Sequence, residues 1–157
     1  MYRVALIFPL LFSTTMNGNA QAVEESYFCN GEFAGGLTFD TGTKHWRGGV
    51  FHVDRKFVLN VKIVGTRMDG ITPVDDLRVT VTASGSNFAA PCVDTREPAN
   101  SIASKYGMIF CTVSFTDYTI SRRTNRFLTV YAVGYVSGED NNDDTPSVTG
   151  GICTKIK

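Results

Sequence analysis

The stretch KFVLNVKIV, residues 56–64, places apolar side chains at every second position. One face of the extended chain carries four apolar side chains, and the other face carries Asn60 and Lys62. The four apolar residues are Phe57, Leu59, Val61 and Ile63. Side chains alternate between the two faces of a β-strand, so this period of two predicts a strand with one buried and one solvated face.

The same alternation recurs along the rest of the chain. LRVTVT (77–82) and MIFCTVSF (108–115) each gather apolar side chains on one face, and GICTKI (151–156) closes the chain. RFLTVYAVGYV (126–136) is apolar on both faces over part of its length. That pattern predicts a central strand of the sheet.

Turn residues separate these runs, for example Gly42 in DTGT (40–43) and Asn125 in RRTNR (122–126). The only candidate for a helix is the short segment 98–106, which has a proline in its first turn. About seven or eight short strands with at most one short helix predict an all-β fold. We expect a single small antiparallel β-barrel, with a β-sandwich as the alternative.

The opening stretch YFCNGEFAGGLTFDTGTKHWRGGVF (27–51) combines a cysteine, a glutamate, several glycines and a histidine beside the only tryptophan. These residues could belong to a reaction centre or to a β-hairpin. Apolar residues flank the turn at 40–42 on both sides, and the glycines suit bulges or sharp bends. We therefore interpret the stretch as a hairpin.

Residues 1–22 have the three parts of a secretory signal peptide. Arg3 supplies the positive charge, residues 4–12 form an apolar run, and AQA at 20–22 is a cleavage site before Val23. The apolar run is much shorter than the roughly 20 residues that cross a bilayer. We expect this segment to be removed on export, which predicts a periplasmic or secreted product.

The remaining residues, 23–157, have the size of one domain, and we expect a single β domain. They carry 14 basic and 15 acidic residues, a net charge of −1. A near-neutral chain lacks the basic surface that binds nucleic acid or anionic membranes, so neither partner is predicted. The bulky residues before Cys29 exclude a lipoprotein cleavage site, so no membrane anchoring is predicted.

Four cysteines lie in the predicted mature chain, and an even number in an exported protein predicts two disulfides. We favour Cys29–Cys153, which would tie the first strand to the last, and Cys92–Cys111, which would span a short loop. The competing connectivity pairs Cys29 with Cys92 and Cys111 with Cys153. The chain has no C-x-x-C motif of the kind that binds zinc or performs thioredoxin-like redox chemistry.

The acidic segment EDNNDDTPS (139–147) contains Asp140, Asn142 and Asp144, which have the spacing of the first three ligands of a calcium loop. The sixth position is Thr145 instead of glycine, and the twelfth is Gly151 instead of glutamate. The residues therefore predict either a looser calcium site in a β-hairpin or a solvated loop. No other cofactor is predicted.

The loop TASGSNF (82–88) presents small polar residues directly after a predicted strand. It resembles the Ser-Gly-x-x-Tyr loop of the periplasmic inhibitors of C-type lysozyme, small antiparallel barrels whose terminal cysteines pair. The resemblance implies that the loop enters the lysozyme cleft and contacts its catalytic carboxylates, with binding residues Ser84, Gly85 and Phe88. Phe88 stands where the family has tyrosine, which removes the hydroxyl contact.

A broader resemblance covers most of the predicted mature chain. The segments CNGEFAGGLTFDTGTKHWRG (29–48), RFLTVYAVGYVSG (126–138) and GGICTKI (150–156) are similar to a group of small exported bacterial proteins of unassigned function. This resemblance implies export and a β fold, and it adds no chemistry.

The chain contains no G-x-S-x-G, H-E-x-x-H or Walker motif, so we predict no catalytic site. The sequence favours an exported binding module with a protein partner, such as a lysozyme-type hydrolase that it inhibits. One alternative is a lipocalin-like carrier of a small apolar ligand, which would need an internal cavity. A further alternative is a hydrolase with an unrecognised acidic site, which would need two convergent carboxylates.

Overall fold

A computed structural model describes residues 23–95, 102–104 and 106–157, so the predicted signal peptide at 1–22 lies outside the described residues. All regular structure in these residues is β-strand, which confirms the all-β prediction. The strands are β1 (Glu24–Asp40), β2 (His45–Val50), β3 (Lys56–Asp69), β4 (Thr72–Ala83), β5 (Ala90–Cys92), β6 (Ile102–Ser104), β7 (Met108–Val113), β8 (Thr116–Ser121), β9 (Arg126–Tyr131) and β10 (Ser147–Lys155). This part of the chain has no helix that could span a membrane.

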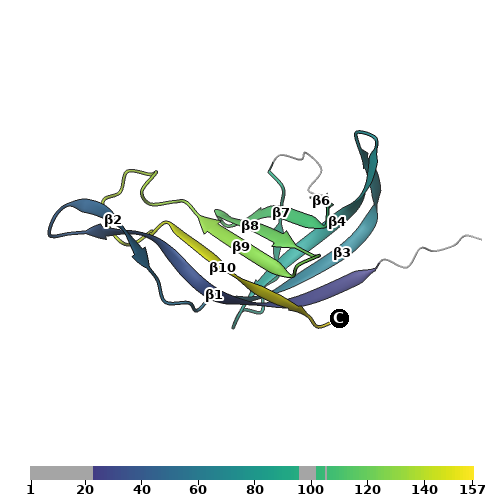
Figure 1. Cartoon of the computed structure of the whole chain (residues 1–157), viewed down its shortest axis with the longest axis horizontal. Coiled ribbons are helices and arrows are strands. Elements are labelled where there is room, and N and C mark those ends of the chain that lie inside the picture. The colour runs from purple at the N-terminus through teal and green to yellow at the C-terminus, as the bar shows by residue number, and fades with distance from the viewer. Residues whose placement is uncertain (1–22, 96–101, 105) are drawn as a thin grey trace, which may run out of the picture.

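The strands form one antiparallel sheet, which excludes the alternative of two packed sheets. Its strand order is β5-β4-β3-β1-β10-β9-β8-β7, with β2 paired to β1 and β6 paired to β4. The sheet is curved, and the β1–β2 and β3–β4 hairpins project from it at opposite ends (Figure 1). The expected hairpin at 27–51 is confirmed, because β1 and β2 pair from Gly35–Val50 to Asp40–His45 around the predicted turn.

Strand β1 lies between an early strand, β3, and the last strand, β10. Its first half pairs with β3 on one side, and β10 pairs along its other side. Cys29 lies directly opposite Cys153 in the β1–β10 register, and the two form the predicted disulfide. A β-bulge between Gly31 and Phe33 then shifts the register.

Within the part of the chain that the structure describes, no strand ladder joins β5 and β7, the two ends of the strand order. They are joined by the second predicted disulfide, Cys92–Cys111, and by one isolated bridge between Val93 and Thr112. The sheet is therefore not closed into the expected barrel. The reason is that β5 and β6, only three residues each, cover the edge of β4 and leave too few backbone groups to pair with β7.

The two disulfides are confirmed in the favoured connectivity, and they fit an oxidising environment. The predicted helix at 98–106 is wrong over Ile102–Ser104, which form β6, and residues 98–101 and 105 lie outside the described residues. Ile102 is fully buried and pairs with Leu77 of β4. Burial of this β-branched side chain outweighs a weak local preference for a helix turn.

The concave side of the sheet is filled by side chains. Phe57 of β3 reaches across to Tyr118 of β8, with ring centroids 5.4 Å apart, and to Phe127 of β9, with ring centroids 5.0 Å apart. All three rings are buried and belong to one apolar core. Opposite walls of the curved sheet are therefore in contact through these rings.

Gly151 of β10 gives a direct test of the packing beside the β1 bulge. An added Cβ would lie 2.1 Å from the carbonyl oxygen of Asn30 and 2.8 Å from the Cα of Gly31. Backbone atoms move less readily than side chains, so we expect Gly151→Ala to lower the free energy of unfolding by about 2 kcal/mol. Chemical denaturation measures this change.

The matched control is Gly65→Ala in β3. An added Cβ there meets no atom within 4 Å, and the backbone is outside the left-handed region. Alanine at such a site leaves stability unchanged or raises it by up to about 1 kcal/mol. Equal losses in the two variants would contradict the packing described for Gly151.

Candidate functional site

The outer face of β9 is apolar and uncovered among the described residues. Phe127 and Thr129 point into the core, whereas Leu128 and Val130 point outward with 43% and 37% of their surface exposed. β9 lies between β8 and β10, so the prediction of a central strand is confirmed. Both faces of β9 carry apolar side chains, but one face is buried in the core and the other is exposed.

Neighbouring strands extend this apolar surface. Val148 and Ile152 of β10 point outward and are exposed, and Val148 lies opposite Val130 in the register. Between them, the ring of Phe33 lies over Gly150, where an added Cβ would meet the ring at 2.1 Å. We call this surface the apolar strip and define it as Phe33, Leu128, Val130, Val148 and Ile152.

A groove of about 650 Å³ lies along one end of the apolar strip. Phe33, Leu128 and Ile152 form part of its apolar lining, and Arg123 and Arg126 of the β8–β9 turn line it as well. A pocket of about 260 Å³ lies at the other end, lined by Val130 and Val148 together with Leu37, Tyr131, Tyr135 and Val136. The strip thus connects a partly cationic groove to an apolar pocket.

The loop singled out by sequence is exposed after β4. Its backbone is ordered by hydrogen bonds from the Ser84 amide to the Lys56 carbonyl, at 2.9 Å, and from the Phe88 amide to Ser86 Oγ, at 3.0 Å. Gly85 has a φ of 81°, a conformation that suits glycine. This turn leaves the Phe88 ring 71% exposed.

A second exposed aromatic residue lies at the same end of the sheet. Val93 and Thr112 pair antiparallel, so the start of β5 and the end of β7 point toward the same end of the sheet. Phe115 lies in the β7–β8 turn and is 78% exposed. We name the loop 82–88 and this turn together the loop end. Sequence reasoning placed Phe115 in a strand and missed its exposure.

The acidic loop folds back onto the β1–β2 hairpin. Asp140 accepts a hydrogen bond from Trp46 Nε1 at 2.9 Å, and the Asn142 side chain bonds both the amide and the carbonyl of Phe39, at 2.7 and 2.8 Å. Asp144 accepts from the Tyr131 hydroxyl at 2.7 Å.

Each of the three predicted calcium ligands therefore has a separate structural partner. The described residues contain no group of three His, Cys, Asp or Glu side chains that could hold a metal ion. The calcium site remains a prediction. No local pattern predicts the contact between Asn142 and Phe39, because the two residues lie 103 positions apart.

Arg122 is part of an ion cluster, although the other two arginines of RRTNR, Arg123 and Arg126, are exposed. Its guanidinium donates to Glu25 at 2.8 and 3.1 Å and to Asp75 at 3.1 Å, and Lys155 donates to Glu25 at 2.8 Å. Glu25 is only 13% exposed. Burial raises the pKa of its carboxyl, but hydrogen bonds from Lys155, Tyr27 and Arg122 outweigh burial and hold that pKa at about 2.

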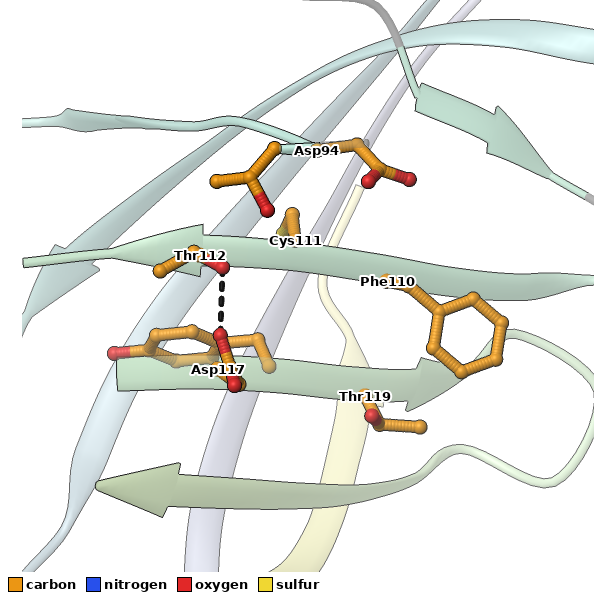
Figure 2. Close-up of a pocket in the computed structure, with 8 residues that line it drawn as sticks. Asp94, Phe110, Cys111, Thr112, Asp117 and Thr119 are labelled. Carbon is orange, nitrogen blue, oxygen red and sulfur yellow. Dashed lines mark hydrogen bonds between the residues drawn. The ribbon is translucent and has the colours of Figure 1, made fainter. Parts of the chain in front are cut away.

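Two carboxylates line a pocket of about 250 Å³ beside β7 and β8, Asp94 and Asp117. They lie on opposite sides of the β7 strand in Figure 2, and Thr112 Oγ1 donates to Asp117 at 2.6 Å. Asp117 is exposed at the surface. The hydrolase alternative requires two convergent acids, and in this pocket Thr112 forms a hydrogen bond to one of the two carboxylates.

The structure thus brings the predicted loop residues together at one exposed end and distributes the predicted calcium ligands among separate partners. It adds the apolar strip, which sequence reasoning did not single out. No protein-family model, curated protein or solved structure matches this chain.

Proposed function

We propose that this protein is an exported binding module that engages a partner protein through its exterior. The observation that carries the proposal is the loop end, where Phe88 of the small polar loop and Phe115 of the β7–β8 turn are both largely exposed. Exposed aromatic rings are the side chains that most often anchor protein interfaces, because they bury a large area with few rotatable bonds.

The filled interior supports this proposal over the carrier alternative. A lipocalin-like carrier needs an internal cavity, whereas Phe57, Tyr118 and Phe127 occupy the space between opposite walls. Export rests on the predicted signal peptide at 1–22 and agrees with the two disulfides.

The partner we propose is a hydrolase of the C-type lysozyme kind. The resemblance of the loop 82–88 to the lysozyme inhibitors implies that the Ser84 hydroxyl would donate a hydrogen bond to a carboxylate of the cleft, with the Phe88 ring lying against the cleft wall. Gly85 adopts the left-handed φ that the turn requires. Because it carries no side chain, the loop would be narrow enough to enter a cleft. On this proposal the bound loop blocks access of the polysaccharide substrate.

The test is residual muramidase activity of a C-type lysozyme titrated with the oxidised, exported protein. We expect saturable inhibition that Phe88→Ala weakens about thirtyfold, as for an aromatic interface anchor. Ser84→Ala should weaken it about tenfold, because it removes a hydrogen bond to a charged group.

The matched control is Tyr106→Ala. Tyr106 is an exposed aromatic residue that precedes β7, at the end of that strand away from the loop end. Its replacement should leave inhibition unchanged. A lack of inhibition by the wild-type protein, or equal weakening by Phe88→Ala and Tyr106→Ala, would overturn the proposed partner.

A further inference from the structure

A second interaction surface is present on the outer face of the sheet, separate from the loop end. The apolar strip exposes five apolar side chains on three strands, and those of β9 and β10 lie next to buried residues that face the core. A contiguous exposed apolar surface on a soluble protein commonly marks a site of interaction.

The charges beside the strip indicate the chemistry of the occupant. The guanidinium groups of Arg123 and Arg126 make no ion pair or hydrogen bond within the described residues, whereas adjacent Arg122 is paired with Glu25 and Asp75. Arginine binds carboxylates through two parallel hydrogen bonds. The groove therefore combines apolar contact with a place for a carboxylate, with Glu32 as the one acidic residue in its lining.

The shape of the surface indicates an extended occupant. Leu128 and Val130 are successive outward residues of one strand, so their side chains are about 6.6 Å apart along it, the spacing of alternate side chains in any extended peptide. The groove lies at one end of the strip, and the apolar pocket continues it at the other.

The groove wall favours a peptide over a lipid chain. The hydroxyl groups of Thr119, Ser121 and Thr124 line the groove and can bond to the amide groups of a peptide, whereas an acyl chain offers them no partner. We propose that the apolar strip binds an extended segment of a partner protein, in which alternating apolar side chains are followed by a carboxylate that lies at Arg123 and Arg126.

The test begins with random peptides displayed on phage and selected on the oxidised protein. We expect the selected peptides to carry apolar residues at alternate positions, followed by Asp, Glu or a free terminal carboxylate. A labelled peptide of the selected sequence is then titrated by fluorescence anisotropy. Arg126→Glu should weaken binding at least about tenfold, and so should Leu128→Ser.

Matched controls come from β3 and β4, two strands that do not contribute to the apolar strip. Arg78 of β4 is also an exposed strand arginine without an ion pair in the described residues, and Val64 of β3 is an exposed apolar residue. Arg78→Glu and Val64→Ser should leave peptide binding within about twofold of wild type. Thermal unfolding of all four variants checks that each one folds.

Four results would overturn the proposal. The first is selection of peptides that have neither an acidic residue nor a free terminal carboxylate after the apolar positions. The second is equal binding of the selected peptide by Arg126→Glu and Arg78→Glu. The third is a concentration-dependent dimer that Leu128→Ser dissociates, which would make a second copy the occupant. The fourth is binding to phosphatidylglycerol vesicles, lost in Arg126→Glu, without peptide binding.

Discussion

Replacing both Cys29 and Cys153 with alanine is expected to lower the free energy of unfolding by about 5 kcal/mol. The disulfide joins residues 124 positions apart, and both cysteines are buried in the core. A crosslink over so long a loop restricts the unfolded chain strongly, and its removal restores that conformational freedom. A loss of this size is comparable to the whole stability of a small domain. Unfolding in guanidinium chloride measures it.

The shorter disulfide provides the comparison. Cys92 and Cys111 are 19 positions apart, so the same reasoning gives about 3 kcal/mol for their joint replacement by alanine. This variant also releases the contact between β5 and β7, which otherwise depends on the bridge between Val93 and Thr112. If this variant lost as much unfolding free energy as the Cys29 and Cys153 variant, the link between β5 and β7 would contribute more to stability than the length of the crosslinked loop predicts.

Changing Glu25 to glutamine is expected to cost about 3 kcal/mol of unfolding free energy at pH 7 and much less near pH 2. The carboxyl pKa is lowered from 4.5 to about 2 in the folded protein. The folded state therefore binds this proton more weakly than the unfolded chain does. The carboxylate stabilises the fold fully above pH 4.5, and this contribution is lost as the pH falls through 2.

Urea unfolding of wild type and Glu25→Gln across this pH range tests the prediction. The matched control is Glu32→Gln, since Glu32 is exposed and makes no ion pair within the described residues. It should change stability by less than about 0.5 kcal/mol at every pH. If the difference between wild type and Glu25→Gln stayed constant from pH 7 to pH 2, the pKa of Glu25 would not be lowered in the folded protein.

Much of the fold could be predicted because its signals are local. The alternation at 56–64 predicts β3, which extends further, to Asp69, because the long β3–β4 hairpin continues the ladder beyond the alternating segment. The predicted pairing of Cys29 with Cys153 implied that the first and last strands are neighbours, and β1 and β10 are indeed adjacent. The open edge between β5 and β7 could not be predicted, since no local pattern reports how short a paired strand will be.

The surfaces were harder to predict for a different reason. Periodicity shows that Leu128 and Val130 share a face of β9, but it does not show whether another layer covers that face. Phe115 continues an apolar run in the sequence, yet its φ of 62° places it in a turn. Partners such as Phe39 for Asn142 are far apart in the chain and depend on the tertiary fold.

We propose above all that this protein binds a partner protein through the loop end on its exterior. Hydrogen–deuterium exchange of the oxidised protein, with and without a C-type lysozyme, tests that claim most directly. We predict slower exchange in the complex at residues 82–88 and in the β7–β8 turn, with the core strands unchanged. Unchanged exchange at the loop end, or a change confined to the strands that contribute Phe57 and Phe127, would contradict it.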